Sequence, residues 1–185
     1  MNEFELKILD FIQDNIKCGF LDFLMPIVTL LGEGGVFWIV TAAVLLVFKK
    51  TRKVGAMMGV ALALGFVVGN LTLKPLVARV RPYDMPGVNI ELLVDSLSDK
   101  SFPSGHTLAC FEAATVLFIA NKRIGIPALV LAVLVAFSRL YLYVHYPTDV
   151  LCGAVLGILF GILASIIVKQ IISAYYCKIN SRNKE

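Results

Sequence analysis

The sequence predicts an all-α protein, a polytopic membrane bundle of about six transmembrane helices, and three observations support that fold class. Of the 185 residues, 58% are hydrophobic and 16% are charged, whereas soluble globular proteins carry about 25% charged residues. The apolar residues gather in runs that approach the length needed to cross a bilayer, about 20 residues per helix. Basic residues gather between those runs, as the positive-inside rule describes for cytoplasmic loops. We therefore expect an integral membrane protein.

Six apolar runs are expected to span the membrane. They are residues 16–31, 35–48, 54–73, 107–120, 126–143 and 150–172. The first two are short and are separated by Gly-Glu-Gly-Gly at residues 32–35, so five spans plus a surface helix is the open alternative. Because the spans account for most of the chain, residues 1–185 are expected to form a single domain.

The N-terminal segment, residues 1–15, mixes acidic with apolar side chains and does not resemble a cleaved signal peptide. It is expected to be retained. Phe4, Ile8, Phe11 and Ile12 recur at helical spacing, which predicts an interfacial helix on the membrane surface or, as the alternative, a cytoplasmic helical cap.

The basic segments predict the orientation of the protein in the plasma membrane. They follow the second, fourth and sixth runs and comprise Lys49, Lys50, Arg52, Lys53, Lys122, Arg123, Lys178, Arg182 and Lys184. All of them fall on one side of the six-span layout, so that side and both termini are predicted to be cytoplasmic. The ends of the first, third and fifth runs then face the outside.

The longest loop, residues 82–102, is predicted to lie on the outer side and to contain a short helix. Ile90, Leu93, Val94 and Leu97 recur in it at helical spacing, as in a helix that rests on the outer leaflet. A lid or lipid-entry element is one interpretation of this segment, and a passive connector is the other.

Nucleic-acid binding and cysteine-based sites are both disfavoured. The net charge of +4 is explained by cations at the cytoplasmic ends of spans. The four cysteines form no Cys-x-x-Cys pair and lie in or beside apolar runs, so neither a zinc site nor a disulfide framework is indicated. No obligate protein partner is indicated either.

Cations on the outer side have no topological explanation, and they predict an anionic partner. They are Lys74, Arg79, Arg81, Lys100 and Arg139. Lys74 and Arg81 flank a proline-interrupted stretch and can converge on one group at headgroup depth. Arg139 lies just inside the end of the fifth run, where its guanidinium offers a fork of donors for phosphate oxygens.

The stretch FPSGHT at residues 102–107 predicts the start of the fourth spanning helix. Ser104 is a good N-cap, and the first backbone N–H groups of a helix are unpaired and favour an anion such as phosphate. Gly105 allows that anion to approach the backbone. His106 then lies in the first helical turn beside it.

His145 and Asp149 are four residues apart, and Pro147 between them favours a loop that leads into the sixth span. The carboxylate can fix the tautomer of the imidazole and leave the other ring nitrogen free to act as a nucleophile. A metal site is the rival use of two histidines and an aspartate. No third ligand stands at HExxH-like spacing, however, and the nearby cations would repel a metal ion, so we expect no metal and no cofactor.

Glu112 is a further candidate, because an ionisable residue inside a spanning helix is costly and often functional. It lies six residues beyond His106, roughly 9 Å along the helix. A structural role as the partner of an inward-facing donor is therefore expected.

Three stretches of the chain together resemble the signature of the type 2 phosphatidic acid phosphatase superfamily of membrane lipid phosphatases, which shares its motif with bacterial acid phosphatases and vanadium haloperoxidases. The signature is Lys, six residues, Arg-Pro; then Pro-Ser-Gly-His; then Ser-Arg, five residues, His, three residues, Asp. The matching residues are Lys74, Arg81, Pro82, Pro103, Ser104, Gly105, His106, Ser138, Arg139, His145 and Asp149.

The resemblance implies a role for each catalytic residue. His145 attacks phosphorus, Asp149 orients it, and His106 protonates the leaving group. The phosphoryl oxygens are held by Lys74, Arg81, Arg139 and the backbone of Ser104 and Gly105. Fixed cations then neutralise the charge that other enzymes neutralise with magnesium.

The resemblance implies metal-independent hydrolysis of a lipid phosphate or diphosphate at the outer face of the membrane, through a phosphohistidine intermediate. Undecaprenyl diphosphate is the first expectation for the substrate, because an outward site suits recycling of that carrier. A phosphatidylglycerophosphate or phosphatidate phosphatase is the alternative. Two other functions remain as alternatives. One is a transporter or flippase that binds the headgroup without cleaving it, and the other is a haloperoxidase.

Overall fold

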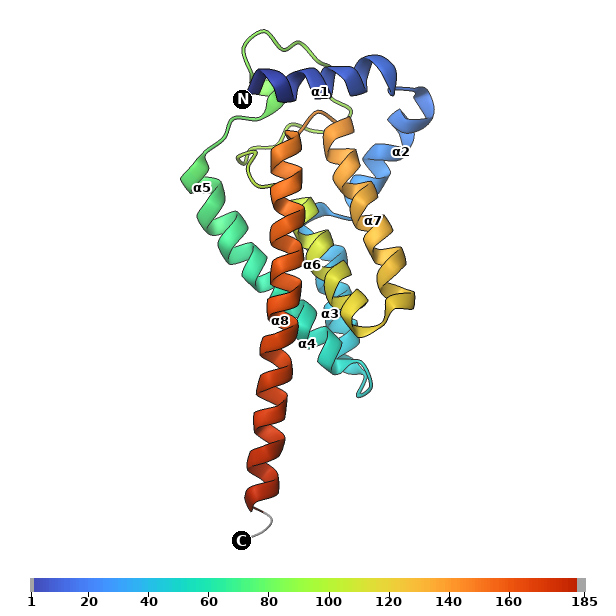
Figure 1. Ribbon diagram of the computed structural model, residues 1–185. Helices are drawn as coiled ribbons and strands as arrows, with labels where there is room; N and C mark the ends of the chain where they lie inside the picture. The colour runs from blue at the N-terminus through green and yellow to red at the C-terminus, as the bar shows by residue number, and fades with distance from the viewer. Residues whose placement is uncertain (1, 183–185) are drawn as a thin grey trace.

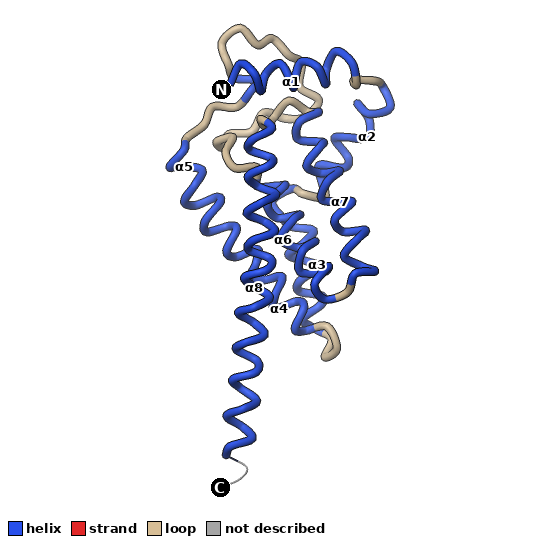
Figure 2. The backbone as a smooth tube through the Cα atoms, viewed as in Figure 1, coloured by secondary structure: helices blue, strands red, loops and turns tan. Residues whose placement is uncertain are grey.

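The computed structural model describes residues 2–182, and all regular secondary structure in that range is helical (Figures 1 and 2). The elements are α1 (Asn2–Asn15), α2 (Gly19–Leu30), the 3₁₀ turn η1 (Glu33–Gly35), α3 (Val36–Val47), α4 (Arg52–Gly65), the π-helical η2 (Phe66–Leu73), α5 (Lys74–Val77), the 3₁₀ turn η3 (Pro82–Asp84), α6 (Gly105–Ala120), α7 (Lys122–Tyr141) and α8 (Pro147–Arg182).

Helix α6 lies at the centre of the bundle and packs against α4, α7 and α8. The backbones of α6 and α8 approach closely at the small residues of α8. A Cβ atom on Gly153 would lie 2.8 Å from the carbonyl oxygen of Ser104, and one on Gly157 would lie 2.7 Å from that of Leu108. Gly153 and Gly157 therefore allow α6 and α8 to pack closely.

The first two predicted spans form one broken crossing, so the prediction of six spans is wrong at this point. Helices α2 and α3 continue in one direction and are separated only by η1 (Figure 1). Gly34 and Gly35 have φ of 55° and 68°, a left-handed conformation that glycine adopts without steric cost. The glycines therefore let the helix break and resume without reversing.

The membrane-crossing segments follow from this merger. Within residues 2–182, four segments are long and apolar enough to cross a membrane: Gly19–Val47, Arg52–Asp84, Lys122–Tyr141 and Pro147–Cys177. The shorter apolar helix α6 lies among them. If α6 is counted with them, the bundle has the five crossings of the alternative expectation, and the surface location of its additional helix stays a prediction.

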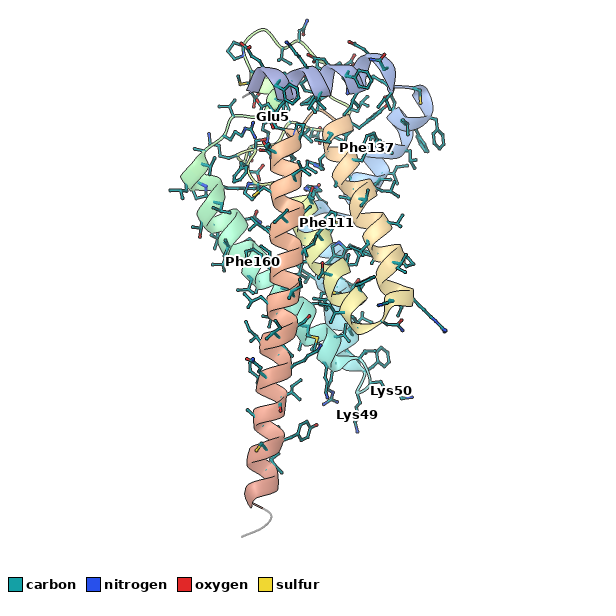
Figure 3. The ribbon with its side chains drawn as sticks, in the orientation of Figure 1. Glu5, Lys49, Lys50, Phe111, Phe137 and Phe160 are labelled. Carbon is teal, nitrogen blue, oxygen red and sulfur yellow. The ribbon has the colours of Figure 1, made fainter. Side chains whose placement is uncertain are left out.

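The two ends of the bundle differ in charge and in the helices they carry. Lys49 and Lys50 project at the end toward which α8 extends, while Glu5 lies at the opposite end (Figure 3). Helix α1 crosses that opposite end (Figure 1). The N-terminal and C-terminal helices thus lie at opposite ends, which contradicts the prediction that both termini share one side. Merging the first two spans removes one crossing and produces this difference.

Helix α1 confirms the helix predicted near the N-terminus and packs against α7 and α8. Leu9 and Ile12 are buried, whereas Phe4 and Phe11 are exposed. Contact with the membrane surface remains a prediction for this helix. Met1 and the basic residue Lys184 lie outside the described residues.

The short helix predicted within residues 82–102 is absent from the described chain, which has only η3 in that segment. Ile90, Val94 and Leu97 nevertheless pack against buried residues of α1, α7 and the segment after α7. The Tyr83 hydroxyl fixes the loop by accepting from the N–H of Leu97 at 2.9 Å and donating to its carbonyl at 3.1 Å. Ile90, Val94 and Leu97 therefore pack individually from an irregular segment, whereas Leu93 is exposed.

Candidate active site

A cavity of about 700 Å³ lies among α3, α4, α6 and the loop before α6. Residues from all three predicted motif stretches line its polar end, namely Lys74, Arg81, Gly105, His106 and His145. Its volume lies within the range of small-ligand sites, about 300–1,000 Å³. The fold therefore brings the three stretches together around one space.

The remainder of the cavity is largely apolar and follows the spanning helices. Its lining includes Ile39, Ala42, Ala43, Leu46, Gly59, Leu62, Ala63, Phe66, Leu108 and Ala109. Small residues on α3, α4 and α6 leave this space between the helices. A cavity with a charged end and an apolar remainder suits an amphiphilic molecule such as a lipid with a charged headgroup.

His145 lies in the segment between α7 and α8 and is 1% exposed. Its Nδ1 is 3.6 Å from Oδ2 of Asp149, and its Nε2 is 3.3 Å from Nη1 of Arg81. A neutral ring with its proton on Nδ1 fits both contacts, because Nε2 then presents a lone pair to the guanidinium. The 3.6 Å separation exceeds a hydrogen bond, and catalytic contacts of this kind commonly tighten when substrate binds.

The charge state of His145 follows from its surroundings. Burial lowers its pKa, the interaction with Asp149 raises it, and the charges of Arg139 and Arg81 lower it again, to about 3. The imidazole is therefore neutral near pH 7. Neutral imidazole is the form whose free nitrogen can act as a nucleophile.

Asp149 has more partners than the sequence indicated. Its Oδ2 accepts hydrogen bonds from the hydroxyl of Ser101 and from the N–H of Tyr146 at 3.0 Å. Its Oδ1 accepts from Nη1 of Arg79 at 2.5 Å. Sequence reasoning missed Ser101 and treated Arg79 as a cation for the anionic partner. Neither residue stands at a spacing that pairs it with Asp149, so the folded chain alone reveals both contacts.

Arg139 is a buried cation with unused donors. It is 2% exposed, and its Nη1 donates to the Thr29 hydroxyl at 2.5 Å. Its Nε and Nη2 have no hydrogen-bond partner among the residues that the structure describes. Buried donors without acceptors are costly, so these atoms indicate a place for an anion.

Lys74 and Arg81 contact a carboxylate that sequence reasoning did not assign to the site. Both bind the side chain of Asp99, which lies on the loop before α6. Burial raises the pKa of Asp99, but the hydrogen bond and charge of Lys74, followed by those of Arg81, outweigh it and lower the pKa to about 2. Asp99 thus places a negative charge between two cations that were predicted to hold phosphate.

Ser104 caps α6 as predicted. Its hydroxyl lies 2.9 Å from that of Thr107, and its N–H donates to the carbonyl of Asp149 at 3.1 Å. In this conformation both polar groups of Ser104 therefore have protein partners. Phosphate binding by the Ser104 backbone remains a prediction.

Gly105 borders the cavity beside two polar groups. A Cβ atom on Gly105 would lie 3.3 Å from Oδ1 of Asn70 and 3.8 Å from Nζ of Lys74. Asn70 was missed by sequence reasoning, although its Oδ1 is buried without a hydrogen-bond partner among the described residues. It lies in the π-helical η2, and π-helical turns are frequent at functional sites.

His106 lies in the first turn of α6 and faces the break between α2 and α3. Its Nε2 is 3.1 Å from Oε2 of Glu33, a residue that sequence reasoning treated only as part of the break. A Cβ atom on Gly32 would lie 2.9 Å from Cδ2 of His106. The glycine-rich break therefore surrounds the imidazole and brings a carboxylate to it.

Glu112 borders the apolar part of the cavity and is 1% exposed. Its Oε1 has no hydrogen-bond partner among the described residues, so the side-chain donor expected from the sequence does not contact this atom. Gly65 provides the space for the carboxyl group, because a Cβ atom there would lie 2.0 Å from Oε1.

The described residues contain no group of three or more histidine, cysteine, aspartate or glutamate side chains that could hold a metal ion. Function without a metal remains a prediction. The groups that meet at the cavity are instead a neutral imidazole, a second imidazole beside a carboxylate, and the basic side chains of Lys74 and Arg81.

An all-helical membrane bundle whose two histidines and basic side chains meet at one cavity is a phosphate-handling membrane protein by its fold and site. The chain belongs to the PAP2 superfamily, whose family model matches residues 51–173. The matched segment contains every residue of the three predicted motif stretches.

The chain is similar to proteins named for lipid phosphatase activity. It is 38% identical over 121 residues to an undecaprenyl-diphosphatase of Sulfolobus acidocaldarius, a match that covers 65% of this chain and 58% of that relative. The matched part thus spans less than two thirds of the relative's length.

Two crystal structures share the fold. Aquifex aeolicus LpxE superposes with a TM-score of 0.74 and 32% identity, over 86% of this chain and 93% of that chain. A transmembrane PAP2-type phosphatidylglycerolphosphate phosphatase from Bacillus subtilis superposes with a TM-score of 0.71 and 29% identity, over 92% and 85% of the two chains.

Proposed function

We propose that this protein hydrolyses a lipid phosphate or diphosphate without a metal ion, through a phosphohistidine intermediate. The observation that carries the proposal is the buried guanidinium of Arg139, whose Nε and Nη2 have no hydrogen-bond partner among the described residues and whose charge acts on the neutral imidazole of His145. Such a site has donors for a phosphoryl group and a nucleophile to attack it. The PAP2 family membership supports the same chemistry.

In the proposed first step, Nε2 of His145 attacks phosphorus and forms a P–N bond. The attacked phosphorus is the terminal one. Its bond to the leaving oxygen breaks, and that oxygen, which belongs to the lipid monophosphate when the substrate is a diphosphate and to the lipid alcohol when it is a monophosphate, takes the electron pair and a proton from His106. Asp149 stabilises the positive charge on the phosphorylated imidazole. Lys74, Arg81 and Arg139 neutralise charge on the non-bridging oxygens, which is the main requirement of phosphoryl transfer.

In the second step, water attacks the phosphohistidine and His106 accepts its proton. The P–N bond breaks, inorganic phosphate forms, and His145 returns to its neutral state. The carboxylate of Glu33, 3.1 Å from Nε2 of His106, stabilises the proton that moves on and off this ring. A phosphoryl group bound nearby favours the protonated imidazole in the same way.

The proposed substrate is undecaprenyl diphosphate, and a phosphatidylglycerophosphate or phosphatidate is the second candidate. The apolar part of the cavity accommodates a lipid chain next to the charged end. The relative named undecaprenyl-diphosphatase supports the first substrate. The neighbour named a phosphatidylglycerolphosphate phosphatase supports the second.

We infer that the site faces the outside of the plasma membrane. The basic segments after α3 and α6 lie at the end of the bundle opposite α1 and the loop before α6, and the positive-inside rule makes that basic end cytoplasmic. Helix α1 then lies on the outer side and the end of α8 on the cytoplasmic side. In a variant whose exposed Cys18 and Cys177 are replaced by serine, a cysteine engineered at exposed Glu3 should be labelled by a membrane-impermeant thiol reagent in intact cells. Protection until lysis would refute this orientation.

The test of the proposed activity is phosphate release by the purified protein in detergent from a panel of undecaprenyl diphosphate, phosphatidylglycerophosphate and phosphatidate. Wild-type protein should release phosphate from at least one lipid, and chelator should not abolish the reaction. His145→Ala should abolish it while the melting temperature stays within a few degrees. Binding of the lipids without any phosphate release would favour a transporter or flippase and overturn the proposal.

A further inference from the structure

Glu5 of α1 is linked to the catalytic carboxylate through one arginine. Nη1 of Arg79 contacts Oδ1 of Asp149 at 2.5 Å, and its Nη2 contacts Oε2 of Glu5. Oε1 of Glu5 accepts from the N–H of Thr148 at 3.0 Å and from its hydroxyl at 2.6 Å. Glu5 is only 3% exposed, a degree of burial that glutamate rarely reaches without paired charges.

Arg79 is fixed on several sides. Besides the two carboxylates, its Nη1 contacts the Thr148 hydroxyl at 2.7 Å, and its guanidinium lies 3.8 Å from the centre of the Tyr146 ring. The planar guanidinium binds carboxylates with a fixed geometry and stacks on aromatic rings. Its position therefore fixes the position of Asp149.

Neither Glu5 nor Arg79 belongs to the motif positions that carry the family resemblance. Glu5 also precedes the segment matched by the family model, residues 51–173. Figure 3 shows Glu5 beside the start of α8, the helix that carries Asp149. The N-terminal helix thus brings a buried charge to the site from outside the matched segment.

The charges explain why two acidic groups flank one arginine. If Arg79 paired with Asp149 alone, its positive charge would weaken the ability of Asp149 to stabilise positive charge on His145. Glu5 offsets the charge of Arg79 from the other side. Asp149 then keeps net negative charge toward Nδ1 of His145, where positive charge develops when the ring is phosphorylated.

We propose that Glu5 and Arg79 are positioning residues that fix the orientation of Asp149 and the net charge around it. Helix α1 therefore contributes a positioning residue, Glu5, to the active site. The inference rests on the proposed phosphatase function, because its effect is expressed through His145. Buried ion pairs by themselves are weak support for stability, whereas this pair ends on the carboxylate that orients the nucleophile.

Glu5→Gln is the first test. It keeps the shape of the side chain and removes the charge that offsets Arg79. We expect kcat to fall about tenfold, the lower end of the effect of removing a group that orients a catalytic side chain. KM should stay within about twofold, because Glu5 does not contact the phosphate site. Glu3→Gln is the matched control on the exposed face of α1, and it should retain wild-type kcat.

A double-mutant cycle separates positioning from general stabilisation. Arg79→Met should lower kcat more than Glu5→Gln, because Asp149 loses the ion pair that positions it. Arg79→Lys should recover part of the loss, because it restores an ion pair to Asp149. Glu5→Gln combined with Arg79→Met should be no slower than Arg79→Met alone, since Glu5 acts through Arg79. Multiplicative losses in the double variant, or wild-type kcat in Glu5→Gln, would overturn the inference.

Two measurements keep the result interpretable. Melting temperature in detergent reports whether each variant folds, and the rate of phosphohistidine formation in a single turnover reports the step that Asp149 assists. If the wild-type protein is active and Glu5→Gln has the same kcat, the positioning role is rejected and the proposed phosphatase function still stands. A wild-type protein without phosphatase activity rejects the proposed function instead.

Discussion

Asp99→Asn is predicted to tighten the binding of phosphate to this protein. In the structure, the Asp99 carboxylate lies between Lys74 and Arg81, the cations expected to hold the phosphoryl group. A phosphate that enters must therefore displace a negatively charged side chain of the protein itself. Asparagine keeps the size of the side chain and removes the charge, so Lys74 and Arg81 become available to the ligand at lower cost.

The size of the effect follows from the pKa of Asp99, which is lowered from 3.8 to about 2. A change of that size corresponds to at most about 2.5 kcal/mol of interaction with the cations. The Asp99 side chain is 48% exposed, and screening by water reduces an exposed ion pair to about 1 kcal/mol. We therefore expect roughly a fivefold gain in phosphate affinity.

The assay is inhibition of lipid hydrolysis by inorganic phosphate and by vanadate, measured as inhibition constants in wild-type protein and in Asp99→Asn. Because the pKa of Asp99 is about 2, the carboxylate is ionised throughout the range from about pH 5 to 8, and the ratio of the two constants should stay constant there. Asp95→Asn, an exposed position on the same loop, is the matched control. Unchanged or weaker inhibition in Asp99→Asn would show that Asp99 orders the loop and does not compete with the ligand.

Three further predictions test other parts of the site. Ser101→Ala removes a hydrogen bond to Asp149 and should lower kcat several-fold with little change in KM, measured by steady-state phosphate release. Gly65→Ala should destabilise the protein by about 1–3 kcal/mol, because the added methyl group meets Oε1 of Glu112. Thermal melting measures this loss of stability. The double variant Gly65→Ala/Glu112→Ala should recover part of the lost stability, because the clashing carboxyl group is absent. Because the pKa of His145 is about 3, kcat/KM should show no acid limb near pH 6.5 after correction for ionisation of the substrate phosphate, and such a limb in the wild-type protein would contradict a neutral nucleophile.

The residues of the three motif stretches could be predicted because their chemistry is local. Ser104 caps a helix three residues before Thr107, and His145 and Asp149 are four residues apart. Ser101, Glu33 and Asp99 could not be assigned in this way, because each reaches a residue of the three motif stretches through a contact between distant segments. Their polar side chains carry no periodic signal that would distinguish them from other loop residues.

The errors in the fold have equally specific causes. Hydropathy responds to the Gly-Glu-Gly-Gly break in the same way whether it separates two spans or interrupts one. The path of the backbone, in which α2 and α3 continue in one direction, distinguishes these cases (Figure 1). Within residues 82–102, apolar side chains at helical spacing pack separately onto the bundle. Their periodicity therefore matched a helix that the backbone does not form.

The error in span number also concealed the role of the N-terminus. An additional crossing before α4 would place Glu5 and Asp149 at opposite ends of the bundle, where Arg79 could not contact both. With α2 and α3 merged into one crossing, α1 lies at the end of the bundle where α7 ends and α8 begins (Figure 1). Glu5 there contacts Arg79 and Thr148. The broken first span therefore determines the topology and, through it, brings the N-terminal helix to Arg79, which contacts the carboxylate of Asp149. The same break places Glu33 against His106. One glycine-rich interruption therefore accounts for two contacts of the site, that of Glu33 with His106 and that of Glu5 with Arg79.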